Sequence, residues 1–343
     1  MGDVMIRMLA AVFAAYCLAA VPAHAAAADD DEGAEKLFTF KDPRITESSG
    51  LAVSPTHPGV YYTHNDSAAA PTFYAVDGQG RTKATYRLRG AEARDWEAMA
   101  ASKDPRTGRG VLWFADIGDN LDGAWPDVSI YKVMEPQRLG DATLPAVRYR
   151  FRYADGARNA EGIMVNPRTG RLYVVSKEFA GSVYAAPKTL RTDRTNVLRK
   201  VGSAPIMATD AAYAPDGSSY VVRTYFSATL YKPSGETIAR VAMPQLEQAE
   251  SIAFTADGTA LLTGSEGVRS PLYRVPLPAR AVAAASPSAT PTPTPSPAKA
   301  ESSLDAQADG PADGGLSLKD VLIWLAAAAT AIGVITFIAR RTA

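Results

Sequence analysis

The feature that most constrains this chain is a short pattern that recurs five times. Each copy opens with an acidic or small polar residue, enters a short apolar strand, turns at Pro, Asp or Gly, and continues into a second strand. The matching apolar positions are residues 51, 99, 163, 212 and 252, so the intervals are 48, 64, 49 and 40 residues. Repeats of about this size built from short strands are typical of propeller blades. The sequence therefore predicts an all-β fold, a β-propeller of four-stranded blades.

The number of blades depends on how the ring closes. Segments 215–217 and 256–258 carry Asp-Gly turns, which suit the first hairpin of a blade. The last repeat has only three predicted strands, the third of them at 272–275. The first predicted strand of the body, 36–40, precedes the first repeat and has no strand of its own to pair with. If this early strand completes the last blade, the ring closes without an exposed edge. The prediction is five blades, or six if the 64-residue interval contains a degenerate blade.

The two ends of the chain predict an extracellular, membrane-anchored protein. Residues 1–25 read as a signal peptide, since Arg7 precedes an apolar run and Ala23-His24-Ala25 is a small-x-small cleavage site. The propeller is expected at 35–280, and 281–318 form a disordered stalk rich in Pro, Ala, Thr and Ser. Residues 320–340 predict one transmembrane helix that ends in a short Arg-Arg tail on the cytoplasmic side.

Composition excludes several functions. The net charge is +0, so the chain lacks the excess of basic residues that is typical of nucleic-acid-binding proteins. The only cysteine, Cys17, lies in the signal segment, so the body has no thiol chemistry. No motif for an organic cofactor is present, and the partners expected are the membrane and an unknown extracellular ligand or protein.

Propeller geometry predicts where polar residues gather. The first strand of each blade lines the channel and the second returns beside it, so starts of first strands and ends of second strands share one face. Carboxylates crowded there repel one another unless a cation or basic groups neutralise them, and oxygen ligands suit Ca²⁺ or Mg²⁺. The expected metal ligands are Glu97, Asp116, Glu161, Asp210 and Glu250. The expected ligand-binding residues are Asn65, Asp66, Asp95, Lys177, Arg223 and Glu266, and the expected catalytic residues are His64 and Glu97.

Each of these residues also has a purely structural interpretation. Acidic residues at strand starts often accept backbone N–H groups, and Lys177 and Arg223 can neutralise them without a metal. His64 can equally be a neutral histidine bonded to a neighbouring loop.

Several segments together resemble a known family. They are Ser49-Gly50-Leu51, His64-Asn65-Asp66-Ser67, Asp95-Trp96-Glu97, Asp116-Ile117-Gly118-Asp119-Asn120 and Ala160-Glu161-Gly162. Over residues 45–180 the chain resembles secreted bacterial propellers of the phytase/esterase-like (SdiA-regulated-like) group, which is common in actinobacteria. The resemblance implies a calcium-dependent or metal-binding propeller and hydrolysis of phosphate or carboxylic esters. The resemblance would lead us to expect an acidic ligand in a later blade at a position where this chain has Arg223 and Thr224.

Two functions follow from the sequence. The first is a cell-surface propeller that binds a ligand or partner, with a cation, at the channel face. The alternative is a metal-dependent hydrolase that uses the same face. In that case the carboxylates hold the ion, His64 or Glu97 transfers the proton, and Lys177 with Arg223 bind an anionic substrate.

Overall fold

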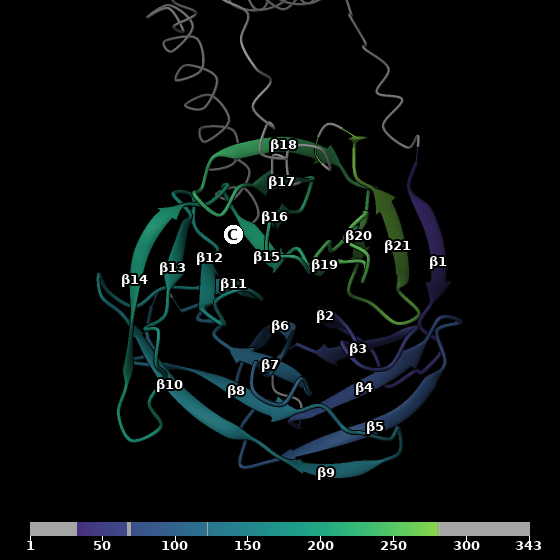
Figure 1. The fold of residues 1–343 in the computed structure, drawn as a ribbon, viewed down its shortest axis with the longest axis horizontal. Coiled ribbons are helices and arrows are strands. Elements are labelled where there is room, and N and C mark those ends of the chain that lie inside the picture. The colour runs from purple at the N-terminus through teal and green to yellow at the C-terminus, as the bar shows by residue number, and fades with distance from the viewer. Residues whose placement is uncertain (1–32, 67–69, 122, 280, 282–343) are drawn as a thin grey trace, which may run out of the picture. The chain divides into compact units, whose positions relative to one another are not determined.

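The computed structural model describes residues 33–66, 70–121, 123–279 and 281, which form a ring of 21 strands (Figure 1). The predicted signal peptide, the stalk beyond residue 281 and the predicted membrane helix lie outside the described residues. Among the residues that are described, no helix has the length and apolar character needed to cross a bilayer.

The first two blades follow the predicted order. Blade 1 contains β2 (Ser48–Val53), β3 (Val60–Asn65), β4 (Thr72–Asp77) and β5 (Thr82–Arg89). Blade 2 contains β6 (Trp96–Lys103), β7 (Gly110–Asp116), β8 (Val128–Met134) and β10 (Val147–Tyr153). The sequence analysis missed β9 (Ala142–Pro145), which pairs in parallel with β5 as a fifth strand.

The remaining three blades complete the ring. Blade 3 contains β11 (Ala160–Val165), β12 (Leu172–Ser176), β13 (Ser182–Ala185) and β14 (Asn196–Ser203). Blade 4 contains β15 (Ala208–Tyr213), β16 (Tyr220–Thr224), β17 (Ser227–Tyr231) and β18 (Thr237–Ala242). Blade 5 contains β19 (Ile252–Phe254), β20 (Ala260–Gly264), β21 (Pro271–Pro276) and β1 (Glu35–Thr39).

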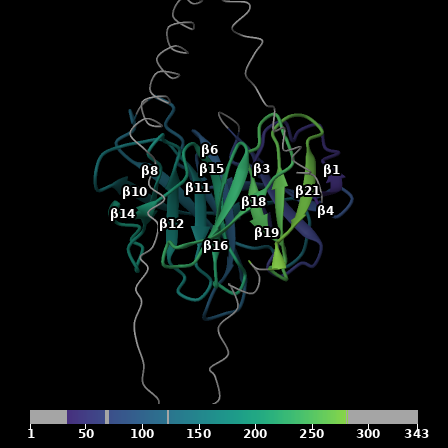
Figure 2. The same ribbon diagram turned by 90° about the horizontal axis from the view of Figure 1, so that it is seen from above.

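The ring closes as predicted. β1 pairs antiparallel with β21, so the first described strand completes the last blade, and the described residues form five blades. The innermost strands contact one another in the order β2, β6, β11, β15, β19 and back to β2. Figure 2 shows them running along the ring axis. The Asp-Gly turns also behave as expected, because Gly217 and Gly258 have φ values of 69° and 70°.

Each pair of neighbouring blades encloses its own apolar core. Trp96 and Phe114 lie between blades 1 and 2, in a cluster with Tyr62 and Phe73. Four further clusters fill the interfaces between blades 2 and 3, 3 and 4, 4 and 5, and 5 and 1. The ring is therefore held by sheet-to-sheet packing, and the start of every innermost strand must lie near one axis.

Truncating the closing strand should destabilise the whole ring. The Phe38 ring is buried and lies 5.5 Å from Phe40 and 5.4 Å from Tyr61, measured between ring centroids. We expect Phe38→Ala to lower the free energy of unfolding by about 3 kcal/mol in urea denaturation, since truncating a buried aromatic costs about that much. Lys36→Ala, at an exposed position of the same strand, should change it by less than about 0.5 kcal/mol. Equal effects of the two substitutions would contradict closure by β1.

Candidate cation and ligand site

The innermost strand of four blades contains a β-bulge at the same register position. Pairing with the second strand skips one residue in β2, β6, β11 and β15, and the skipped residues are Ser49, Glu97, Glu161 and Thr209. A bulge bends the strand and re-aims the side chain of the extra residue. Glu250 stands at the corresponding position of blade 5, two residues before β19. The bulges therefore bring one residue of each blade to the start of the channel, which we call the mouth.

A second set of side chains reaches the mouth from the ends of the second strands. In each case the backbone N–H donates to the carbonyl oxygen of the residue two positions before the bulge position of the same blade. The distances are 3.0 Å for Asp66, 3.1 Å for Lys177 and 3.0 Å for Glu266. These shared contacts place the three side chains at equivalent positions of blades 1, 3 and 5. Tyr225 takes the same position in the sequence after β16.

Three carboxylates lie close enough to share one cation. One carboxylate oxygen from each of Asp66, Asp95 and Glu97 lies within 4.8 Å of the other two. Gly118 makes room for this arrangement, because a Cβ at that position would overlap Asp95 Oδ2 and Glu97 Oε1. An all-oxygen set of this kind suits a hard divalent cation such as Ca²⁺ or Mg²⁺.

Asp116, a predicted metal ligand, serves this cluster indirectly. Its Oδ1 accepts the backbone N–H of Asp95 at 2.8 Å, and burial raises the pKa of its carboxyl. The Asp95 carbonyl in turn accepts the N–H of Gly118 at 3.2 Å. Asp116 therefore orients the segment that carries Asp95 and is not one of the three clustered carboxylates.

The mouth concentrates negative charge in a buried setting. Burial raises the pKa of Glu97 far above its usual range, and the charges of Glu161 and Asp66 raise it further. Burial also raises the pKa of Asp95 to about 6 and that of Glu266 to about 7, with added repulsion from neighbouring carboxylates. Ionisation of each group is therefore disfavoured relative to a carboxyl in water, and a bound cation would favour it.

Lys177 supplies a positive charge on the other side of the mouth. Its Nζ lies 2.6 Å from Glu161 Oε1, and both side chains are largely buried. Burial alone would lower the pKa of Lys177, but the attraction of Glu161 outweighs it and the pKa is raised. Burial raises the pKa of Glu161 despite this partner, and Glu250 adds to the effect. The Tyr225 ring lies 5.1 Å from Nζ, measured to its centroid.

The structure does not bring His64 into the mouth. Its side chain is fully buried between blades 1 and 2, where its ring lies 5.4 Å from Trp96 and 6.1 Å from Phe114. Nδ1–H donates to the Asn65 carbonyl at 3.0 Å, and burial lowers the pKa of the imidazole. The structural interpretation of His64 therefore agrees with its surroundings, and the predicted catalytic role does not.

The Asn65 amide is likewise occupied. Oδ1 accepts the backbone N–H groups of Thr46 and Glu47 at 3.1 and 3.2 Å, and Nδ2 donates to the Arg44 carbonyl at 2.8 Å. Asn65 therefore holds segment 44–47 beside the end of β3.

Asp210 was expected at the bulge position of β15, but it lies one residue after that position. Alignment by apolar residues matched it to Glu97 and Glu161, but the bulge of blade 4 falls on Thr209. Its carboxylate is fully buried and accepts the N–H groups of Ala211 and Ile252 at 2.7 and 2.8 Å. Asp210 thus joins the innermost strands of blades 4 and 5.

Arg223 lies in the same interface and pairs across the strands with Asp210. Its side chain is fully buried, and Nε donates to the Ala249 carbonyl at 3.3 Å. Burial lowers the pKa of its guanidinium to about 10, an effect that the charges of Glu250 and Asp210 partly offset. Arg223 therefore neutralises buried carboxylates between two blades.

Sequence reasoning missed Gly118 and Tyr225. Gly118 was read only as part of a motif, and its role depends on a close approach that spacing does not reveal. Tyr225 could have been found, because it follows its second strand in the same register as Asp66 and Lys177 follow theirs.

Exposed apolar side chains surround the mouth. Most large apolar residues exposed in the described chain lie on loops of this face: Leu121, Trp125, Phe179, Ile206, Phe226 and Val268. Phe179 and Phe226 are 84% and 73% exposed and follow β12 and β16 closely. A ligand at the mouth would meet apolar contacts around an acidic centre.

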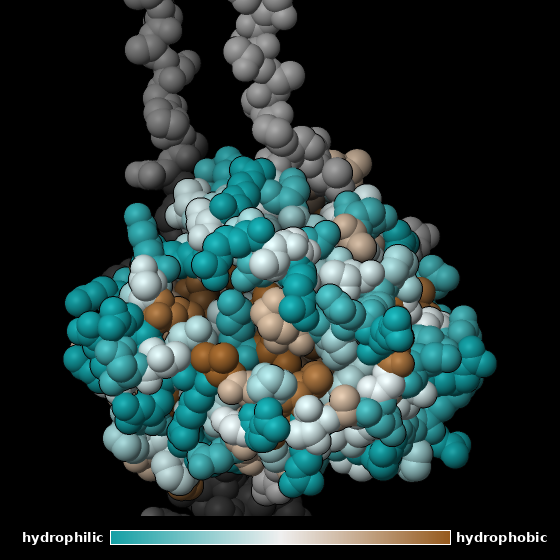
Figure 3. Space-filling model, turned by 60° about the horizontal axis from the view of Figure 1, so that its bottom comes forward, coloured by the Kyte–Doolittle hydropathy of each residue, from teal (hydrophilic) through white to brown (hydrophobic). Residues whose placement is uncertain are grey.

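The opposite half of the channel differs chemically. A cavity of about 470 Å³ opens there between the hairpin turns and is lined by apolar residues that include Leu51, Met99 and Ile252. Figure 3, which shows one face of the molecule, has apolar side chains gathered near the middle of a mainly hydrophilic surface. None of the clustered carboxylates lines this cavity, so that cluster is confined to the mouth.

Comparison with solved structures finds distant matches to this chain. No family model and no curated protein matches the chain. A solved structure of a gluconolactonase from Xanthomonas campestris aligns with 67% of this chain and 72% of its own, at 18% identity and a TM-score of 0.44. The propeller assignment rests on the strand pairing of the chain itself.

The cation-free protein should lose stability as the pH rises from 5 to 8. Asp95 and Glu266 have folded-state pKa values of about 6 and about 7, above their ordinary values of 3.8 and 4.5. Protonation of these two carboxyls stabilises the folded state fully when the pH is below their ordinary pKa values. This stabilisation is lost as the pH rises through their folded-state pKa values. Urea midpoints in EDTA should fall across this range, and excess Ca²⁺ should flatten the trend. A midpoint that rises with pH in EDTA would contradict the crowding of these carboxylates.

Asp210→Asn should reduce stability without affecting the mouth. An asparagine at this position can accept at only one oxygen, so one buried N–H of Ala211 or Ile252 loses its partner, at a cost of about 1–3 kcal/mol. The same variant should bind Ca²⁺ with unchanged affinity in calorimetry. A tenfold loss of affinity would restore Asp210 to the cation site.

Proposed function

We propose that this chain is a cell-surface propeller that binds Ca²⁺ at the mouth and, beside it, a small extracellular ligand. The observation that carries the proposal is the approach of Asp66, Asp95 and Glu97 oxygens to within 4.8 Å of one another. Carboxylates in this arrangement repel one another, and a bound divalent cation would remove that cost. Placement outside the cell on a single membrane helix is part of the proposal and is supported by the two ends of the sequence.

The residues present fit a calcium ion better than a transition metal. All three side chains offer oxygen, and His64, the one histidine near them among the described residues, is buried in an apolar interface. Ca²⁺ accepts six to eight oxygen ligands in a flexible arrangement, so three side chains leave room for water and ligand oxygens.

The charges and the apolar side chains around the mouth indicate the chemical class of the ligand. Six carboxylates outnumber the three nearby positive charges, those of Lys177, Arg223 and Arg94, and this excess does not favour a highly phosphorylated ligand. The six are Asp66, Asp95, Glu97, Glu161, Glu250 and Glu266. The exposed apolar loops favour a ligand with a carbon skeleton that can contact Phe179 or Phe226. A carbonyl or carboxyl oxygen on such a ligand would complete the shell of the cation.

Ca²⁺ should raise the melting temperature of the full chain by several degrees relative to EDTA. A ligand at 100 times its dissociation constant adds about 2.7 kcal/mol to stability, which is a shift of this size for a domain this large. Glu97→Gln should abolish the shift. No shift at millimolar Ca²⁺ would overturn the proposal.

A paired glycine experiment separates cation binding from folding. Gly118→Ala places a Cβ against the carboxylates of Asp95 and Glu97, and these flexible ends can move aside at little cost in stability. We therefore expect a nearly unchanged melting temperature in EDTA and at least tenfold weaker Ca²⁺ binding. Gly78→Ala is the control, because its Cβ would meet no atom within 4 Å. Equal Ca²⁺ affinities would place the cation elsewhere.

The Lys177–Glu161 pair favours a second function, hydrolysis of an ester or lactone at the same mouth. A bound divalent cation supplies polarisation of the substrate carbonyl. Glu161, whose pKa is raised by burial, can accept a proton near neutral pH, and Lys177 holds its carboxylate at 2.6 Å. Tyr225 packs against Lys177 and fixes the position of the pair.

This second function predicts Ca²⁺-dependent turnover of a short-chain aryl ester or a δ-lactone. Glu161→Gln should lower kcat at least about 100-fold, as expected for loss of a general base. The Ca²⁺ affinity of the variant should stay within about threefold, because Glu161 is outside the clustered carboxylates. Turnover that is equal in wild type and variant would exclude this function and leave binding alone.

A further inference from the structure

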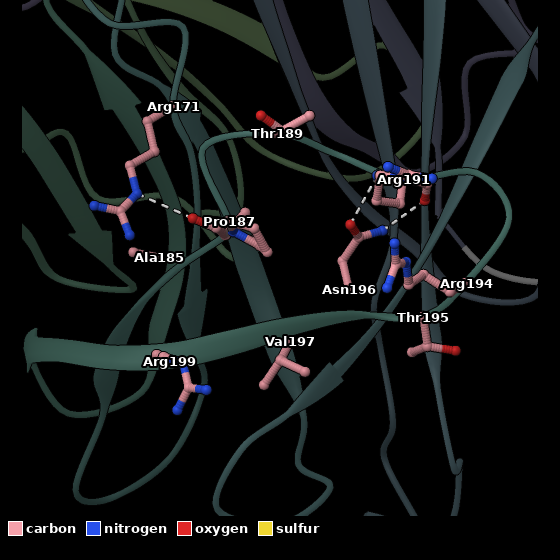
Figure 4. A pocket seen from close by; sticks show the side chains of 11 residues that line it. Arg171, Ala185, Pro187, Thr189, Arg191, Arg194, Thr195, Asn196, Val197 and Arg199 are labelled. Carbon is pink, nitrogen blue, oxygen red and sulfur yellow. Dashed lines mark hydrogen bonds between the residues drawn. The ribbon is translucent and has the colours of Figure 1, made fainter.

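A basic pocket lies on the outer edge of blade 3, separate from the mouth. It has a volume of about 460 Å³ and is formed by the β13–β14 connection, parts of β13 and β14, and Arg171 just before β12. Arg171, Arg191, Arg194 and Arg199 line it, and no carboxylate does so among the described residues. Figure 4 shows Arg171 on the left, Arg191 and Arg194 on the right, and Arg199 below Arg171 on the strand that crosses the view. Four guanidinium groups around one cavity are notable in a chain with a net charge of +0.

The loop that carries two of these arginines is held by a neutral side chain. Asn196 is 4% exposed, and its Oδ1 accepts the Arg191 backbone N–H at 2.9 Å. Its Nδ2 donates to the carbonyls of Arg191 and Arg150 at 2.9 and 3.0 Å. Asn196 thus orders the loop through backbone groups and does not engage the arginine side chains.

The arginines keep most of their hydrogen-bonding capacity. Arg171 donates only Nε, to the Ala186 carbonyl at 3.0 Å. Arg191 pairs with Asp193 at 3.0 Å, and both side chains are at least half exposed. The guanidinium groups of Arg194 and Arg199 form no hydrogen bond or ion pair within the described part of the chain. The hydrogen bond from Arg191 lowers the pKa of Asp193, and the charge of Arg194 contributes to this lowering. After the Asp193 pair is counted, about three positive charges remain.

We propose that this pocket binds a phosphate group of an extracellular phosphorylated ligand. The planar guanidinium fork matches phosphate oxygens in bidentate geometry, and all four basic residues that line the pocket are arginines. The volume admits a phosphate with a small polyol or sugar attached. Neighbouring strand β10 adds exposed Arg150 and Arg152 beside β14, which extends the basic surface.

The test is binding of sn-glycerol 3-phosphate and inorganic phosphate to the full chain by calorimetry at constant ionic strength. EDTA is present throughout, so that a cation at the mouth cannot bridge to phosphate. We expect saturable binding that weakens at least tenfold in the Arg194→Ala/Arg199→Ala double variant. The control is Arg87→Ala/Arg89→Ala, which removes the same charge from exposed positions of β5 in blade 1.

Co-sedimentation with phosphatidylglycerol vesicles identifies the source of the phosphate. Vesicle binding that the pocket variant loses supports a lipid headgroup, and binding of the soluble phosphates alone supports a free ligand. Equal weakening in both double variants would show general charge attraction and overturn the proposal. Absence of binding to soluble phosphates and vesicles would also overturn it.

Discussion

Five apolar interfaces between neighbouring sheets hold this ring together, and the site depends on them. Each interface buries its own cluster, so no blade is complete without the next. Face-to-face packing places five innermost strands around one axis. Polar side chains from Asp66 to Glu266, separated by 200 residues in sequence, then share one mouth. The packing therefore imposes the charge crowding that the mouth must neutralise.

The mouth neutralises this charge in two different ways. On the side of blade 3, Lys177 pairs with Glu161, and between blades 4 and 5 the buried Arg223 offsets Glu250 and Asp210. On the side of blades 1 and 2, Asp66, Asp95 and Glu97 have close carboxylate neighbours, and Gly118 permits their approach. Lys177 and Arg223 thus serve one half of the mouth. On the other half the charge of Arg94 only partly offsets the burial and repulsion that raise the pKa of Asp95, and we propose a cation there.

The sequence predicted the parts of the fold that depend on local chemistry. Short strands, Asp-Gly turns and the unpaired early strand led to five blades and to closure by β1, because each has a local signature. The residues that reach the mouth were predicted less well, because a bulge moves the register by one position. This shift exchanges Thr209 for Asp210, and spacing alone cannot reveal it. His64 was misplaced for a related reason, since the direction of a side chain between two sheets depends on packing.

The most direct test of the central claim is an anomalous difference map from crystals grown with Ca²⁺. The account predicts one strong peak at the mouth, about 2.3–2.6 Å from oxygens of Asp66, Asp95 and Glu97. Crystals of the Gly118→Ala variant should lack that peak while the ring stays unchanged. A mouth without a peak at millimolar Ca²⁺, or a peak bound only by other residues, would contradict the account.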